Sequence, residues 1–298
     1  MLVAFGLLTF GLADSSKAVA GGGVSFGTPK GAVAALVGAV NTNDLEKLIA
    51  LFGAEYEDDL IGGDEAAFRA NLKILSRAFG EASRLQDVDD RTKALIVGTE
   101  AWPFPFPLVK AAQGWHFDTE AGIEEVITRR IGRNELNAIQ LCRAYRNAQV
   151  QYAQTDRDGD GVREFAQHIA SNGAKKDGLY WQAAIGEEVS PFGPLVADAR
   201  DYLEDREIGD PFKDYYYKIL TRRGAGSPGG RYDYIINGNM IAGFALIAFP
   251  ADYGNSGIMT FICSHQGKVF QKDLGEEGDL IAGGIVIYNP DASWSGVR

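Results

Sequence analysis

The first third of the chain carries apolar residues at helical spacing, divided into three runs by residues that start and stop helices. Thr28 followed by Pro29, then Asn43 followed by Asp44, and finally Asp64 each stand just before such a run. Ser, Thr, Asn and Asp accept hydrogen bonds from the free N–H groups at a helix start, and Pro is tolerated at the first helical position. The pattern predicts three helices, over residues 29–40, 44–52 and 64–79.

Segments of strand character follow these helices, at residues 93–99, 104–110 and 114–118. The prolines between Trp102 and Pro107 are typical of an edge strand or an extended segment, because Pro cannot donate to a sheet. Helices followed by an antiparallel sheet resemble the cone of nuclear-transport-factor-like proteins, a fold that often carries a pocket. The resemblance covers residues 28–118. Four aromatic residues there either line a pocket or pack in the core: Trp102, Phe104, Phe106 and Trp115.

The helical pattern resumes at Thr119, is interrupted at Gly132, and continues as a long helix from Asn134 to Ala153. Shorter helices are predicted over 164–170 and up to Leu203. Strands are predicted at 215–221, 240–249, 257–263, 268–272 and 284–288, with a hairpin turn at 265–267.

We therefore expect an α+β protein with two domains. Residues 21–131 form an N-terminal domain of helices and antiparallel sheet. Residues 132–298 form a C-terminal domain, in which the long helix leads through an acidic loop to an antiparallel β meander.

That acidic loop is the most specific chemical feature of the sequence. It reads DRDGDGVRE, with carboxylates at every second position of its first half and a glycine, Gly161, after the third aspartate. Alternating oxygen ligands with a glycine at the sharp turn are how a chain wraps calcium. We expect one structural calcium ion. The expected ligands are Asp156, Asp158, Asp160, Val162 (through its carbonyl) and Glu164.

The loop departs from the standard calcium loop at its end. Position twelve is Gln167, where that template requires a bidentate Glu, so the loop is not a standard EF-hand. The alternative interpretation is a solvated acidic turn, since Asp and Gly dominate turns. In that case Arg157 and Arg163 supply part of the neutralising charge.

The start of the chain is typical of a signal peptide over residues 1–20. A mostly apolar run from Met1 to Leu12 is followed by Ala18-Val19-Ala20 and three glycines, so cleavage is expected after Ala20. No Lys or Arg precedes the run, and the alternative is a buried N-terminal element. The run is too short to span a bilayer. We expect a periplasmic or secreted protein with no transmembrane span in the mature chain.

The net charge and the absence of catalytic motifs exclude several classes of function. A net charge of -11 and a pI near 4.8 argue against nucleic-acid and anionic-membrane partners. Cys142 and Cys263 belong to no metal-binding pattern, and two buried free thiols are favoured over a disulfide. The three histidines (His116, His168 and His265) form no motif, and zinc-protease, nucleophile-elbow and phosphate-loop signatures are absent.

Two classes of function remain. The first is a non-enzymatic envelope protein, binding or structural, with a calcium-stabilised loop and an unidentified envelope or extracellular partner. The second is a carboxylate- or calcium-dependent hydrolase that acts on an envelope or extracellular substrate.

Seven segments form a specific combination: DRDGDGVREFAQ, KKDGLYW, SPFGPL, PFKDYYYKILT, PGGRYDYIINGNM, GFALIAFPADYGNSGIMTF and GKVFQKDLG. Together they resemble a family of exported bacterial proteins known as domain of unknown function twenty-nine fifty. The resemblance covers nearly all of the mature chain, and it implies an envelope or secreted location without any particular activity. More loosely, the second half is similar to the globular part of pseudopilins, where calcium rigidifies an acidic loop between a long helix and a meander. The domain before the helix departs from that pattern.

Overall fold

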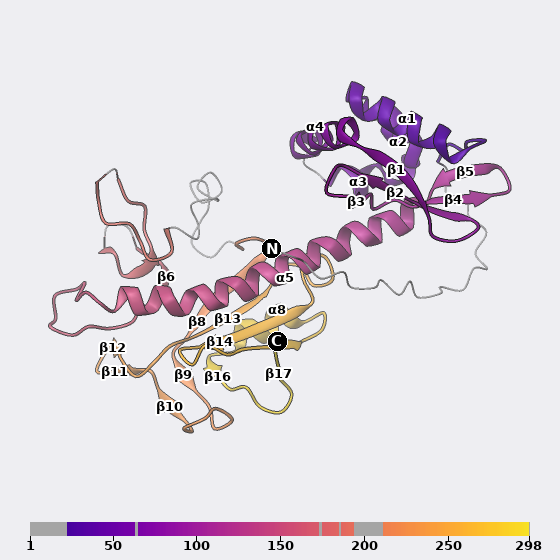
Figure 1. The fold of residues 1–298 in the computed structure, drawn as a ribbon. Coiled ribbons are helices and arrows are strands. Elements are labelled where there is room, and N and C mark those ends of the chain that lie inside the picture. The colour runs from indigo at the N-terminus through magenta and orange to yellow at the C-terminus, as the bar shows by residue number, and fades with distance from the viewer. Residues whose placement is uncertain (1–22, 63–64, 173–174, 185, 194–210, 298) are drawn as a thin grey trace. The chain divides into compact units, whose positions relative to one another are not determined.

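The structure, a computed structural model, describes residues 23–62, 65–172, 175–184, 186–193 and 211–297 (Figure 1). It combines helices with antiparallel sheets, as the expected α+β class requires. The chain divides into two compact units, residues 1–126 and 127–298. The expected boundary after residue 131 and this division both fall within one helix, α5 (Thr119–Tyr152). The signal-peptide prediction concerns residues outside the described ranges.

The helices of the first unit begin where their capping residues predict. The Thr28 hydroxyl accepts a hydrogen bond from the Gly31 N–H (3.1 Å), and the Asp44 carboxylate accepts one from the Lys47 N–H (3.1 Å). All three predicted helices are confirmed, and α3 is an addition that the sequence pattern missed. The elements are α1 (Pro29–Thr42), α2 (Leu45–Phe52), the short 3-10 helix η1 (Ala54–Tyr56), α3 (Glu57–Ile61) and α4 (Glu65–Glu81).

An antiparallel sheet follows, in the order β1-β2-β4-β5, with β3 paired to β2. Its strands are β1 (Ser83–Asp87), β2 (Thr92–Val97), β3 (Trp102–Pro103), β4 (Leu108–Ala111) and β5 (Gly114–Phe117). Strand β1 was not predicted, because its SRLQD sequence is largely exposed and shows no apolar alternation. The predicted strand over 104–110 begins only at Leu108.

Three of the four aromatic residues singled out in the sequence pack in the core of this unit. Phe104, Phe106 and Trp115 are each 8% exposed, whereas Trp102 is 44% exposed. The Phe106 ring centroid lies 4.6 Å from that of Phe52. Of the two alternatives for these side chains, the structure therefore supports core packing for three of the four.

The predicted break at Gly132 is wrong, because α5 continues through it as one helix of 34 residues. A single Gly costs a helix only about 1 kcal/mol relative to Ala. Burial of the face beyond it offsets that cost: Ala138, Cys142, Tyr145 and Ala148 are all at most 2% exposed.

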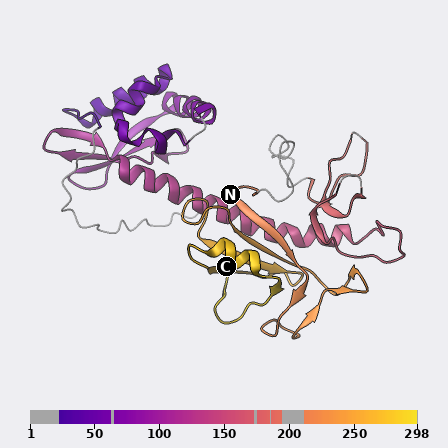
Figure 2. The same ribbon diagram turned by 180° about the vertical axis from the view of Figure 1, so that it is seen from behind.

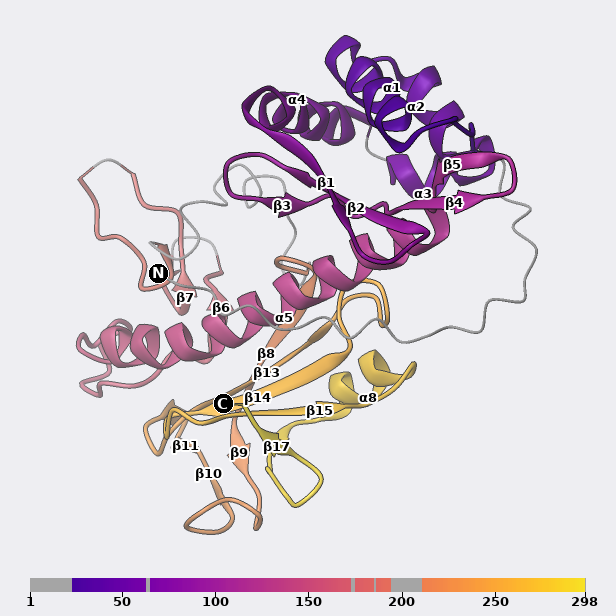
Figure 3. The same ribbon diagram turned by 45° about the vertical axis from the view of Figure 1, so that its right-hand side comes forward.

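The second unit is built on an antiparallel sheet ordered β17-β15-β14-β13-β8, whose central strands form the predicted meander (Figure 3). The turn at 265–267 joins β14 to β15, as predicted. The predicted strand over 284–288 is shortened to two residues and preceded by an unpredicted helix, α8 (Gly278–Gly284). The strands are β8 (Tyr215–Leu220), β13 (Ala245–Pro250), β14 (Met259–Ser264), β15 (Val269–Asp273) and β17 (Ser295–Gly296).

Helices cover both faces of this sheet (Figure 2). Cys263 projects from the face that packs on α5, where its Sγ lies 3.6 Å from the Cys142 carbonyl oxygen. Lys218 projects from the opposite face, and its Nζ donates to the Ala282 carbonyl in α8 (3.1 Å). Successive residues of a strand point to opposite faces of the sheet. Because both faces are covered by helices, the neighbouring residues Leu246 and Ile247 in β13 are both fully buried.

The second unit also contains smaller sheets of two or three short strands. Strand β9 (Arg222–Arg223) lies between β10 (Tyr232–Asp233) and β16 (Ile287–Tyr288), and β11 (Ile235–Ile236) pairs with β12 (Asn239–Met240). Strand β6 (His168–Ala170) pairs with β7 (Gly178–Tyr180). The predicted helix over 164–170 is therefore wrong, and the one ending at Leu203 lies outside the described residues. No helix in the described ranges has both the length and the apolar character of a membrane span.

Candidate functional site

The acidic loop begins four residues after the end of α5. Carboxylate oxygens of Asp156, Asp158 and Asp160 all lie within 4.8 Å of one another. Two oxygens that each lie 2.3–2.6 Å from one calcium ion are at most about 5 Å apart. The structure thus brings together three of the predicted ligands at a spacing that fits a single ion. Asp156 is partly buried, whereas the other two are exposed.

Backbone N–H groups hold the first aspartate in place. The two carboxylate oxygens of Asp156 accept hydrogen bonds from the Gly159 and Gly161 N–H groups (2.8 and 2.9 Å). These bonds lower the pKa of Asp156, so the side chain is ionised at neutral pH. Gly159 and Gly161 have φ angles of 78° and 88°, a region that favours glycine, which is why the loop reads DGDG.

Glu164 lies apart from this cluster of three carboxylates. Its Oε2 accepts hydrogen bonds from the Met240 N–H (2.8 Å) and the Gln167 side-chain amide (3.2 Å). The second oxygen of Asp160 likewise accepts one from the Asn239 side-chain amide (2.8 Å). Both carboxylates thus connect the acidic loop to β12. The sequence carries no local signal for this partner, because β12 lies more than seventy residues further along the chain. The Val162 carbonyl remains a predicted ligand.

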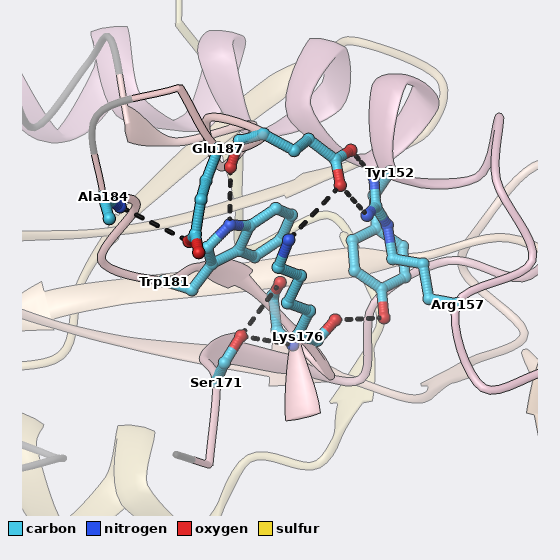
Figure 4. A network of polar contacts seen from close by, with 9 residues as sticks. Tyr152, Arg157, Ser171, Lys176, Trp181, Ala184 and Glu187 are labelled. Carbon is cyan, nitrogen blue, oxygen red and sulfur yellow. Dashed lines mark hydrogen bonds and ion pairs between the residues drawn. The ribbon is translucent and has the colours of Figure 1, made fainter. Parts of the chain in front are cut away.

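Arg157 belongs to a network of polar contacts beside Tyr152, Lys176 and Trp181 (Figure 4). Its guanidinium makes two hydrogen bonds to the Glu188 carboxylate (2.9 and 3.1 Å). Its Cζ also lies 4.8 Å and 4.9 Å from the ring centroids of Tyr152 and Trp181. The side chain is only 8% exposed. Arg157 therefore anchors the start of the loop. Its contacts do not support the alternative interpretation, in which Arg157 neutralises the three aspartates.

The negative charge of Glu188 is neutralised within this Arg157–Glu188 anchor. The hydrogen bond from Arg157 is the main cause that lowers the pKa of Glu188, and Lys176, with its Nζ 3.7 Å away, contributes to the same effect. Among the described residues, no Lys or Arg forms an ion pair with Asp156, Asp158 or Asp160. Three nearby carboxylates without a cationic partner repel one another, which favours a bound cation.

A second contact fixes the segment that follows the loop. The Gln149 side chain on α5 is fully buried, and its amide donates to the Ala166 carbonyl (2.9 Å) and the Tyr145 hydroxyl (2.9 Å). Its Oε1 accepts a hydrogen bond from the Ala166 N–H (2.8 Å). Both backbone groups of Ala166 are thereby used by a side chain, which explains why no helix forms there.

A hollow of about 440 Å³ lies at the other end of the second unit. Its lining includes Asp252, Glu276 and Asp279, and no residue of the acidic loop. Close to this hollow, the Arg130 guanidinium of α5 donates to the Asn255 carbonyl (3.1 Å). Because α5 rises about 1.5 Å per residue from Arg130 to Tyr152, the hollow and the acidic loop are roughly 30 Å apart.

In a comparison with known families, residues 24–297 of the chain match the profile of a family described as a protein of unknown function (DUF2950). The chain belongs to the DUF2950 family. A search of curated proteins and a search of solved structures each found no match. The looser likeness to pseudopilins is not supported by any of these comparisons.

The remaining candidate residues of this DUF2950 protein lie apart from the acidic loop. His116 is buried in β5 of the first unit, whereas His265 follows β14 in the second and contacts the Tyr234 ring. Cys142 and Cys263 are free and buried, as predicted. Burial raises the pKa of the Cys263 thiol well above its usual range, so it is protonated and unreactive at neutral pH.

Proposed function

We propose that this DUF2950 protein is an exported, non-enzymatic binding or structural protein of the bacterial envelope, in which a calcium ion rigidifies the acidic loop. The observation that carries the proposal is the position of the loop. It lies between the end of α5, the β11–β12 hairpin and the Arg157–Glu188 anchor, and roughly 30 Å from the hollow near Asp252. A cation at this position acts on the packing of the second unit rather than on a substrate.

The ligands that the chain offers fit calcium better than a transition metal. Asp156, Asp158 and Asp160 supply hard oxygen donors, and no Cys or His belongs to the cluster. Position twelve of the loop is Gln167, and Glu164 accepts a hydrogen bond from the Met240 N–H, so the bidentate closing ligand of tight calcium loops is missing. We therefore infer a weak site with a Kd on the order of 10⁻⁴–10⁻³ M, which is the range of extracellular calcium modules.

An envelope or secreted location is part of the same proposal. It is supported by the signal-peptide pattern that ends at Ala20, and it supplies the calcium concentration that a weak site needs.

A carboxylate-dependent hydrolase is the second candidate, and the hollow near Asp252 is the observation that favours it. Glu276 and Asp279 also line this hollow, so three carboxylates are available there. All three are exposed to solvent, however, whereas a carboxylate that acts as a general acid usually lies in buried, apolar surroundings. The acidic loop is too far away for a calcium ion there to take part in such a reaction.

The proposal predicts that calcium raises the melting temperature of the second unit. Calcium at ten times its Kd adds about 1.4 kcal/mol to the free energy of unfolding, if it binds the folded state alone. Asp158→Asn retains the size of the side chain and removes one ligand charge, so it is expected to abolish this increment. The measurement is the melting temperature in calcium and in chelator, for both proteins.

Asp90→Asn is the matched control, because it removes the same charge from an exposed turn of the first unit. This control is expected to keep the full calcium-dependent shift. Equal melting temperatures of the wild-type protein in calcium and in chelator would contradict the proposal and favour the interpretation of the acidic loop as an ordinary solvated turn.

A further inference from the structure

Arg223 occupies the middle of the three-stranded sheet β10-β9-β16. Its Cα partners are Tyr232 on one side and Tyr288 on the other. Residues directly opposite in a sheet project to the same face, so the Arg223 side chain runs between two tyrosines. Arg223 is 4% exposed. The adjacent Arg222 projects to the other face, where its side chain is 59% exposed and pairs with Asp233.

One edge of the buried guanidinium has a partner and the other has none. The Nη1 of Arg223 donates to the Tyr232 hydroxyl (2.9 Å), and the Cζ lies 4.7 Å from the centroid of the same ring. Nε and Nη2 are buried, and neither has a hydrogen-bond partner in the described part of the chain. A buried charge without a partner is strongly unfavourable, so the free edge calls for a counter-charge.

Two further polar atoms of the same cluster are also buried without a partner. They are the Tyr234 hydroxyl, on a fully buried residue, and the Nδ1 of His265. The Tyr234 ring lies 5.6 Å from the Tyr232 ring and 5.8 Å from the His265 ring, measured between centroids. Burial is the main cause that lowers the pKa of His265, and Arg223 adds to the effect. The imidazole is therefore neutral, which leaves the guanidinium as the positive charge of this cluster.

We propose that Arg223 binds the oxyanion group of a ligand through its Nε and Nη2 atoms, with the Tyr234 hydroxyl as a further donor. The two N–H bonds on this edge are parallel and match two oxygens of a carboxylate or a phosphate. The carboxylate of Asp233, the acidic residue nearest in the sheet, is already paired with Arg222.

The loop after β9 closes this site. The backbone of Gly229 comes so near that a Cβ built on it would lie 3.2 Å from the Arg223 Nη2. Gly229 and Gly230 have φ angles of 95° and 78°, which other residues rarely adopt. Entry of the ligand therefore requires displacement of residues 224–230. This site is separate from the acidic loop, so its test is carried out with a chelator present and does not depend on calcium.

The test compares the melting temperature in phosphate, acetate and chloride at equal ionic strength, for the wild type, Arg223→Met and Arg222→Met. Phosphate or acetate is expected to raise the melting temperature of the wild type and of Arg222→Met above the value in chloride, and to leave Arg223→Met unchanged. A response to phosphate alone assigns a phosphate-bearing ligand, and a response to acetate alone assigns a carboxylate. Equal shifts in Arg223→Met and the wild type, or no shift beyond chloride in the wild type, would overturn the proposal.

Arg223→Lys provides an independent test if Arg223→Met does not fold. Lys keeps the charge and loses the paired N–H groups, so the affinity for the responding anion is expected to fall by roughly tenfold. Titration calorimetry of the same anion measures this ratio. An affinity of Arg223→Lys equal to that of the wild type would contradict binding through the Nε and Nη2 atoms.

Discussion

Gln149→Leu is expected to lower the free energy of unfolding of the second unit by about 3–5 kcal/mol. Leu fills a similar volume, but it forms no hydrogen bonds with the Ala166 backbone or the Tyr145 hydroxyl. Each buried polar group left without a partner costs about 1–3 kcal/mol. The loss is measured by urea unfolding, with the slope of the transition fixed by the wild-type protein.

Gln151→Leu is the matched control, because Gln151 is exposed near the end of the same helix. Its effect is expected to stay within about 0.5 kcal/mol, as for most surface substitutions. A similar loss in the two variants would mean that the Gln149 contacts do not hold the segment after the acidic loop.

Gly122→Ala and Gly132→Ala are expected to change stability in opposite directions, even though both glycines belong to α5. A Cβ at Gly122 would lie 2.0 Å from a carbon of the Phe106 ring, within the first unit. That ring packs against Phe52 and Phe104, so it cannot move without disturbing the core. Overpacking of this kind costs about 1–3 kcal/mol.

At Gly132 a Cβ would meet no atom within 4 Å. The higher helix propensity of Ala is then expected to add about 0.5–1 kcal/mol to the free energy of unfolding. Thermal unfolding of the two variants provides the comparison. A gain in stability for Gly122→Ala would contradict the close packing of Phe106 on α5.

The elements predicted correctly from the sequence are those with local signals. Thr28 and Asp44 cap their helices, and the apolar strands of the meander lie where their β-branched and aromatic residues indicate. The failures arise where tertiary packing overrides a local signal. Gly132 does not end its helix, and residues 164–170 do not form one, because Gln149 takes the backbone groups of Ala166. Two-residue strands such as β9 carry no periodicity to detect.

The candidate site shows the same division between local and distant contacts. The clustering of Asp156, Asp158 and Asp160 follows from their spacing and from two glycines, so the sequence predicts it. The partner of Glu164 in β12 and the partner of Arg157 at Glu188 depend on how distant segments pack. The unpartnered edge of Arg223 has no signature in the sequence, because it depends on the absence of a hydrogen-bond acceptor near its Nε and Nη2 atoms in the folded, described part of the chain.

We propose that an ion at the acidic loop stabilises the contact between that loop and β12. Hydrogen exchange of the backbone amides, with and without calcium, tests it most directly. The Met240 N–H donates to Glu164 and reports on this contact, whereas the Gly161 N–H donates to Asp156 and reports on the order of the loop itself. Calcium at ten times its Kd is expected to slow their exchange roughly tenfold and to leave amides of β2 in the first unit unchanged. Unchanged exchange at Gly161 and Met240 in saturating calcium would contradict the account.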